Sequence, residues 1–253
     1  MDTVAEALRW LNDPLNWTGR NGVLELTATH LTVTALAVLL GTAVALPLGL
    51  WLGHLRAGAT VGVVVSNTTR ALPTLALLTL LAASGLFGST ATVLACAVFA
   101  APPVLANTVT GIAGVDPAVR DAARGTGLSR WQVLRQVELP LAVPLVAAGL
   151  RTAVVQVIAT VPLAALVGGR SLGTVVVTGF GLQRYGQVVA GGLLVAGLCL
   201  LAELVLALLQ RVASPRGLRL RDAARRTTAG RPSRRRRSRS GDGPAVAGVQ
   251  RLP

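Results

Sequence analysis

The chain has 253 residues, of which 52% are hydrophobic and only 13% are charged. That charged share is about half of what a soluble globular domain usually carries, so the composition excludes an ordinary water-soluble enzyme. The apolar residues gather in runs of about twenty, the length at which a helix crosses a bilayer. The sequence therefore predicts an all-α polytopic membrane protein.

The N-terminal segment, 1–27, lacks the basic stretch followed by an apolar stretch that marks a signal peptide. It is expected to be an amphipathic lead-in on the extracytoplasmic side, with Trp10 and Trp17 anchored at the membrane interface. A transmembrane domain follows over 28–212. Its five predicted spans are 30–53, 60–83, 90–112, 151–168 and 188–209, with a Gly-rich loop between the last two.

Four side chains in or beside these spans carry further expectations. His30 and His54 flank the first apolar run and are expected to be boundary residues rather than metal ligands. Cys96 and Cys199 each stand alone in an apolar run, which is typical of small buried hydrophobes and not of a disulfide framework. The sequence therefore predicts no metal site.

The positive charge of the chain lies mostly behind the last apolar run. All 24 basic residues are Arg, and thirteen of them lie between Arg211 and Arg251. A tail so rich in Arg, Ser, Gly and Pro buries no core. We predict that 213–253 is a disordered cytoplasmic tail that contacts anionic membrane lipid and not nucleic acid.

The other arginines indicate how the spans are oriented. Arg56 lies in the turn after the first span, and four more lie in the polar block 114–138. Cytoplasmic loops carry an excess of Arg. This turn, the polar block and the tail are therefore placed inside a plasma membrane, with the N-terminus and the loop holding Arg170 and Arg184 outside.

The polar block reads as two short helices joined by a turn. Asp116 is positioned to cap the first helix, with Pro117 at its first position, and Gly125 and Gly127 end it. Ser129 followed by Gln132 three residues later is the signature of a capping box for the second helix. The pattern predicts a cytoplasmic helix–turn–helix to which another protein binds.

The second helix of the block has its own predicted face and end. Trp131, Leu134 and Val137 recur at helical spacing and should share one face. Pro140 is expected to follow the end of this helix. An interfacial amphipathic helix without a partner is the alternative.

Residues 121–140, DAARGTGLSRWQVLRQVELP, resemble the cytoplasmic EAA coupling loop of ABC importer permeases. Asp121 stands where Glu is usual and Val137 where Ile is usual, and the spacing matches throughout. The matching positions, which the resemblance implies as the contact with the ATPase, are Asp121, Ala122, Ala123, Gly127, Val137, Leu139 and Pro140.

The resemblance continues on both sides of the loop. The stretches 70–78, 107–125 and 149–173 are similar to osmoprotectant permeases, which import glycine betaine, choline, carnitine or proline. The resemblance implies a five-helix permease core that forms the translocation pathway. It also implies an extracytoplasmic binding protein, an identical or related second permease and ATPase subunits. The alternatives are a permease for another small solute, such as an amino acid, and a non-ABC channel or structural membrane protein.

The chain itself is not expected to be an enzyme or to hold a cofactor. A P-loop needs a Lys at the nucleotide phosphates, and this chain has no Lys. The sequence shows no paired carboxylates, His cluster or nucleophile motif either. ATP hydrolysis is therefore assigned to a partner subunit.

Polar residues inside the predicted spans are candidates for lining the pathway. Thr152, Gln156 and Thr160 recur every four residues and form one stripe, which either lines the pathway or bonds to a neighbouring helix. Arg70 lies within an apolar run, where a charge costs about 2.5–3.5 kcal/mol. It must snorkel, face the bundle interior or pair, with Glu203 as a candidate partner, and it is a further pathway candidate. Arg151 is expected at the cytoplasmic end of its span.

Overall fold

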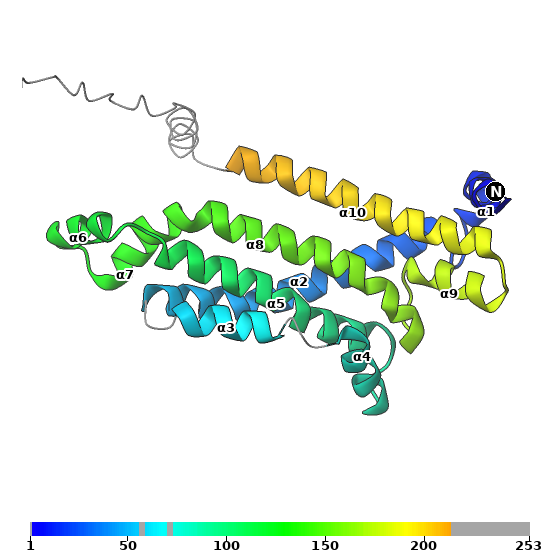
Figure 1. Cartoon of the computed structure of the whole chain (residues 1–253), viewed down its shortest axis with the longest axis horizontal. Helices are drawn as coiled ribbons and strands as arrows, with labels where there is room; N and C mark the ends of the chain where they lie inside the picture. The colour runs from blue at the N-terminus through cyan, green and yellow to red at the C-terminus, as the bar shows by residue number, and fades with distance from the viewer. Residues whose placement is uncertain (1, 56–58, 70–72, 214–253) are drawn as a thin grey trace, which may run out of the picture. The chain divides into compact units, whose positions relative to one another are not determined.

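The computed structural model describes residues 2–55, 59–69 and 73–213 (Figure 1). Over these residues the chain is helical, with no strand. The N-terminal elements are α1 (Asp2–Asn12), η1 (Pro14–Asn16), α2 (Val23–His54), α3 (Ala59–Thr69), α4 (Thr74–Ala83) and α5 (Gly88–Ala113). The remaining elements are α6 (Pro117–Gly125), α7 (Arg130–Val133), the π-helix η2 (Leu134–Glu138), α8 (Leu139–Thr160), the 3₁₀ helix η3 (Val161–Val167), α9 (Gly173–Gly181) and α10 (Tyr185–Ala213). Two subjects of prediction lie outside the described residues: Arg70, and the predicted tail after Ala213.

Four stretches of the described residues are long and apolar enough to cross a membrane: Val23–His54, Gly88–Ala113, Arg130–Val167 and Tyr185–Arg211. The spans expected over 30–53, 90–112 and 188–209 lie within α2, α5 and α10. Helix α2 begins at Val23, so His30 lies inside it and is not a boundary residue. The His30 side chain is buried, with Nε2 3.0 Å from the carbonyl oxygen of Ile158 in α8.

The span predicted over 60–83 is an apolar run interrupted by Arg70 and Pro73, and the structure does not form it as one helix. The structure has two separate helices there, α3 and α4, and both contact α5. Helix α4 begins after Pro73, whose backbone is extended. A proline lacks the N–H that a helix interior needs and forces the preceding residue away from helical geometry. Each helix alone is roughly 15 Å long, about half of the hydrocarbon thickness.

The fourth predicted span also differs, because its helix begins long before residue 151. The stretch Arg130–Val167 runs from α7 through the π-helix, α8 and η3 without a loop. Pro140 therefore does not follow the end of a helix. It lies in the first turn of α8, directly after the π-helix, where the regular i→i−4 hydrogen bonds are already interrupted and a missing N–H costs little.

Helices α2, α5 and α8 form the core of the described bundle. Their buried contacts involve small side chains, including Ala37, Ala45, Ala100 and Ala153, and the buried Cys96. Small residues let helix backbones approach closely in a membrane protein, where no hydrophobic effect drives helices together. Cys199, on α10, is only partly buried.

Gly49 shows how close α2 and α5 lie. A Cβ atom built on Gly49 would stand 2.7 Å from the Cβ of Thr108 on α5. We expect Gly49→Leu to destabilise the bundle by about 1–3 kcal/mol, the usual cost of overpacking, and to lower the melting temperature in detergent. The matched control is Gly197→Leu on α10, because a Cβ there has no neighbour within 4 Å. Equal melting temperatures for the two variants would contradict this packing.

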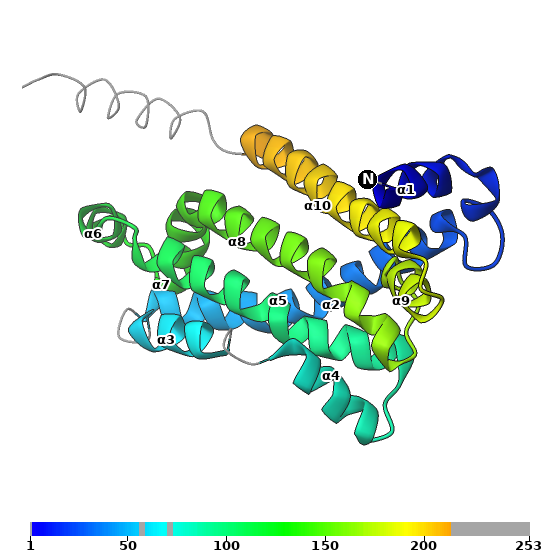
Figure 2. The ribbon, with the colours of Figure 1, turned by 45° about the vertical axis from the view of Figure 1, so that its right-hand side comes forward.

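A second cluster packs at the end of the bundle where α1 and α9 lie (Figure 2). Trp10 and Trp17 contact a buried group that includes Leu26 of α2 and Val175 of α9. The two indoles are thus packed partly inside the protein, where only interface anchors were expected. The stretch expected to be only a Gly-rich loop contains α9, and it is tied to α2 by an ion pair between Arg170 and Glu25 at 2.9 Å.

Candidate functional site: the polar loop between α5 and α8

Helix α6 begins and ends as its residue types predict. The Asp116 side chain accepts a hydrogen bond from the N–H of Ala118 at 2.9 Å, and Pro117 occupies the first helical position. Helix α6 ends at Gly125, and Gly127 has φ +88°. Glycine adopts this left-handed conformation without the steric cost that a side chain brings. This conformation forms part of the turn between α6 and α7.

The next helix begins with the predicted capping box. The Ser129 Oγ accepts from the N–H of Gln132 at 3.4 Å, and the Ser129 N–H donates to the Gln132 Oε1 at 2.8 Å. Helix α7 then continues into the long helix that contains α8. The second helix of the polar block is therefore an extension of a membrane span. No loop separates α7 from α8.

The face expected for the second helix is unevenly buried, although Trp131 and Leu134 line the same hollow. The Trp131 side chain is 68% exposed, whereas Leu134 is 7% exposed. The buried residues are Val133, Leu134 and Glu138. Val137 lies in the π-helix Leu134–Glu138, which has a wider turn than an α-helix, and its side chain is partly buried.

The structure divides the seven EAA-like positions into two groups. Asp121, Ala122 and Gly127 are exposed on α6 and its turn, and Ala123 is partly buried. The other three positions lie at and after the π-helix: Val137 and Leu139 are partly buried and Pro140 is exposed. The first group faces outward, and the second group joins the loop to α8.

A buried polar cluster in this region was not predicted from the sequence. Glu138 is fully buried, with Oε2 2.7 Å from His54 Nδ1 and Oε1 2.9 Å from Arg120 Nε. The Arg120 guanidinium also donates to the carbonyl of Ile112. Glu138 is not one of the seven positions that match the EAA loop, so the resemblance gave no signal for it. The available signal was a carboxylate beside Pro140 at the start of an apolar run.

These contacts fasten the loop to two spans. His54 is the last residue of α2, and Ile112 lies in the last turn of α5. Arg120 belongs to α6 and Glu138 to the π-helix, so three elements meet at one carboxylate, and α5 joins them through the contact between Arg120 and the Ile112 carbonyl. Breaking a buried ion pair by removing one partner costs about 3–5 kcal/mol, because the other charge stays buried alone. The cluster therefore fixes the position of α6 relative to α2 and α5.

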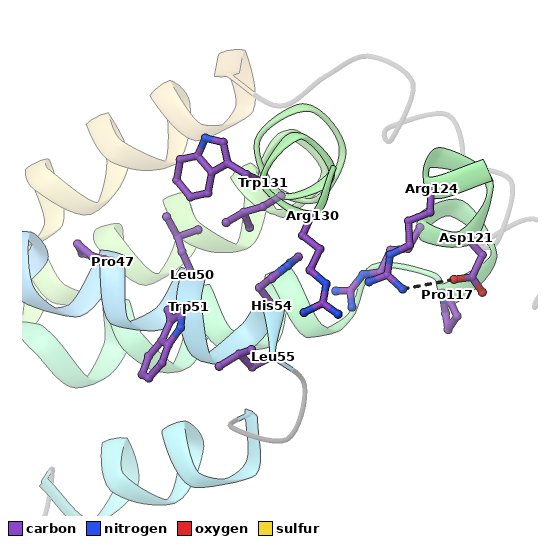
Figure 3. Close-up of a pocket in the computed structure, with 12 residues that line it drawn as sticks. Pro47, Leu50, Trp51, His54, Leu55, Pro117, Asp121, Arg124, Arg130 and Trp131 are labelled. Atoms are coloured by element: carbon purple, nitrogen blue, oxygen red, sulfur yellow. Dashed lines mark ion pairs between the residues drawn. The ribbon is translucent and has the colours of Figure 1, made fainter. Parts of the chain in front are cut away.

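A hollow of ≈ 750 Å³ opens beside this cluster, between the end of α2 and the helices α6 and α7 (Figure 3). Trp51 and Leu55 line it from α2, Arg124 from α6, and Arg130 and Trp131 from α7. Arg124 lies 3.9 Å from Asp121 in an exposed ion pair. An exposed pair at that distance contributes less than about 1 kcal/mol.

The candidate pathway residues lie on α8, away from this hollow. Thr152 is exposed, and Gln156 and Thr160 are partly buried. The Thr152 hydroxyl donates to the Ala148 carbonyl at 3.0 Å, and the Thr160 hydroxyl donates to the Gln156 carbonyl at 2.8 Å. Both hydroxyls thus bond within their own helix. The stripe does not hydrogen-bond to another helix among the described residues, and its role in the pathway stays a prediction.

Arg151 was expected at the end of its span, but it lies in the middle of α8. Its guanidinium contacts Glu203 at 3.2 Å and the Gln210 side-chain oxygen at 3.0 Å, both on α10. Gln210 also donates to the Pro144 carbonyl at 3.1 Å. The partner that the structure gives Glu203 is therefore Arg151, and these contacts hold α10 against α8.

Comparison with known proteins identifies the family. Residues 45–216 match the family described as binding-protein-dependent transport system inner membrane component. The chain belongs to this family. As a family member with several apolar helices, it is a multi-pass plasma membrane protein and a transport permease component.

Similar permeases come from several bacteria. The glycine betaine/carnitine/choline transport system permease protein OpuCB of Bacillus subtilis (strain 168) is 33% identical over 82% of this chain and 97% of its own length. The osmoprotectant import permease protein OsmW of Salmonella typhimurium (strain LT2) is 33% identical over 77% of this chain and 93% of its own length.

The fold of this inner membrane component is also found in a solved structure. A chain of the MetNI methionine ABC transporter, in an inward-facing conformation, superposes with a TM-score of 0.66 at 20% identity. The match covers 76% of this chain and 96% of that chain. At this identity the likeness shows the fold of an ABC importer permease.

Proposed function

We propose that this chain is the permease subunit of an ATP-driven importer for a compatible solute such as glycine betaine, choline, carnitine or proline. Two relatives are each 33% identical to this chain. The name of one contains glycine betaine, carnitine and choline, and the name of the other contains osmoprotectant import. The observation that carries the coupling role is the exposed helix α6, which is capped at its start, attached to α2 through Glu138 and attached to α5 through Arg120.

The proposed partners follow from this role. A separate ATPase contacts the exposed positions of α6, an extracytoplasmic binding protein delivers the solute, and a second permease, identical or related, completes the pathway. The end of the bundle with α6 and α7 is cytoplasmic in this proposal, together with the C-terminus. The end with α1 and α9 (Figure 1) is extracytoplasmic, which places the N-terminus outside.

Movement of α6 has two routes into the membrane. The first passes through Arg120 and Glu138 to His54 at the end of α2. The second passes through α7, which is continuous with α8 and with the stripe of Thr152, Gln156 and Thr160. A rigid connection transmits displacement better than a loop, because a loop absorbs it by changing its own dihedral angles. Within this proposal the stripe and Arg70 contact the solute on its way through the pathway.

The transport proposal is tested by uptake into cells that have or lack this subunit. Radiolabelled glycine betaine should accumulate only in cells with the subunit. Unlabelled choline, carnitine or proline should reduce the uptake of labelled glycine betaine if the same permease carries them. An excess of unlabelled methionine serves as the comparison from another solute class. Uptake that is equal with and without the subunit, or reduced only by methionine, would overturn the assignment to compatible solutes.

A further inference from the structure

The hollow beside the coupling loop has one apolar wall and one cationic wall. Trp51 and Leu55 of α2 form part of the apolar wall. On the other side, Figure 3 shows the side chains of Arg124 and Arg130 reaching from α6 and α7 toward the same space, next to His54. The hollow is thus built for a ligand that is apolar in one part and anionic in another.

The two arginines have little compensation from acidic residues. The Arg130 side chain makes no ion pair or hydrogen bond within the part of the chain that the structure describes, and Arg124 has the exposed contact with Asp121 at 3.9 Å. The buried carboxylate nearby, Glu138, already pairs with Arg120 and His54. Two guanidinium groups that approach one hollow repel each other, so an anion between them would lower the energy of this arrangement.

The apolar wall continues outside the hollow. Leu40, Val44, Leu48, Trp51 and Leu55 are spaced three or four residues apart on α2, and their side chains are between 44% and 61% exposed. Residues at this spacing form one stripe along a helix. The stripe runs along the membrane span and ends in the hollow, at the helix terminus marked by His54.

We propose that this hollow binds an anionic phospholipid, with the phosphodiester between Arg124 and Arg130 and an acyl chain along the α2 stripe. Arginine is suited to phosphate because its guanidinium donates two parallel hydrogen bonds. Trp51 lies between the two parts, where an indole favours the membrane–water interface. A soluble phosphate or an acidic peptide would use the arginines alone and leave the apolar stripe without a function. The proposal rests on the chain crossing a membrane and not on its cargo.

The experiment uses the full chain in nanodiscs and measures quenching of tryptophan fluorescence by lipids with brominated acyl chains. The chain has four tryptophans, and only Trp51 and Trp131 line this hollow. The signal of the hollow is the difference between the unmodified chain and the W51F/W131F variant. Because the Arg-rich tail contains no tryptophan, lipid bound to the tail adds little to this difference.

Brominated phosphatidylglycerol should quench at a lower mole fraction than brominated phosphatidylcholine. An Arg close to an anionic lipid contributes roughly a factor of five, so two arginines predict a roughly 25-fold difference in the half-maximal mole fraction. The variant R124Q/R130Q should lose this difference and R124K/R130K should keep most of it. The control R9Q/R184Q removes the same charge from exposed sites outside the hollow and should behave like the unmodified chain.

Three outcomes would overturn the proposal. Equal quenching by the two lipids in the unmodified chain means that the hollow does not select an anion. A preference that survives in R124Q/R130Q means that other residues bind the lipid. A preference that disappears when the permease is assembled with its ATPase means that the hollow is part of the protein contact. None of these outcomes depends on whether compatible solutes are transported, so they leave the uptake test independent.

Discussion

Replacing Glu138 with Leu is expected to abolish transport while the spans still insert. The substitution leaves Arg120 buried without its carboxylate, at a cost of about 3–5 kcal/mol. The same change removes the 2.7 Å contact with His54, so the loop loses its attachment to α2. We expect a lower melting temperature in detergent, less ATPase copurifying with the permease, and ATP-dependent uptake near background at matched expression.

A double substitution distinguishes the two possible causes of the destabilisation, which are the uncompensated buried charge and the loss of a contact. Arg120→Met combined with Glu138→Leu replaces the ion pair with apolar side chains of similar size, which is often neutral for stability. The double variant should recover most of the melting temperature lost in Glu138→Leu. The control Asp121→Asn removes an exposed carboxylate 3.9 Å from Arg124, and its melting temperature should be unchanged because such pairs contribute little. If Glu138→Leu melts like Asp121→Asn, the buried cluster does not hold the loop.

The second large effect is expected at Gly127. Its φ of +88° lies in the left-handed region, where a side chain costs about 1–2 kcal/mol and a β-branched one more. A Cβ at this position meets no atom within 4 Å, so the cost of Gly127→Val comes from the backbone alone. The turn must then change its path and displace α6. Uptake should fall severely, with normal amounts of permease in the membrane.

Gly125 supplies a closely matched control. It lies two residues earlier, at the end of α6, and a Cβ there also meets nothing within 4 Å. Its φ is not in the left-handed region. Gly125→Val should therefore retain most of the uptake, and Gly127→Asn should fall between the two valine variants because Asn tolerates this conformation. Full ATPase binding and uptake in Gly127→Val would rule out the loop as the coupling element.

Local residue chemistry determined much of the loop and of the membrane character. The Asp116 cap, the proline after it, and the Ser129–Gln132 capping box all appear as their residue types predict. Each depends on atoms within three residues of one another, so the sequence contains the whole interaction. The apolar character of α2, α5 and α10 is likewise a property of consecutive residues. The resemblance to ABC importer permeases, read from the EAA-like spacing, agrees with the family match.

Only the tertiary structure decided which charges meet. Glu138 contacts His54, which lies 84 positions earlier in the sequence, and Arg151 contacts Glu203 on another helix. No local sequence pattern encodes either pairing. A π-helix also interrupts the regular repeat before Pro140, and the helix continues through this proline. A periodicity argument assumes one constant helical repeat, and it fails wherever the repeat changes. A buried carboxylate is stable only beside the cations that compensate it, and those cations come from parts of the chain that are brought together by packing.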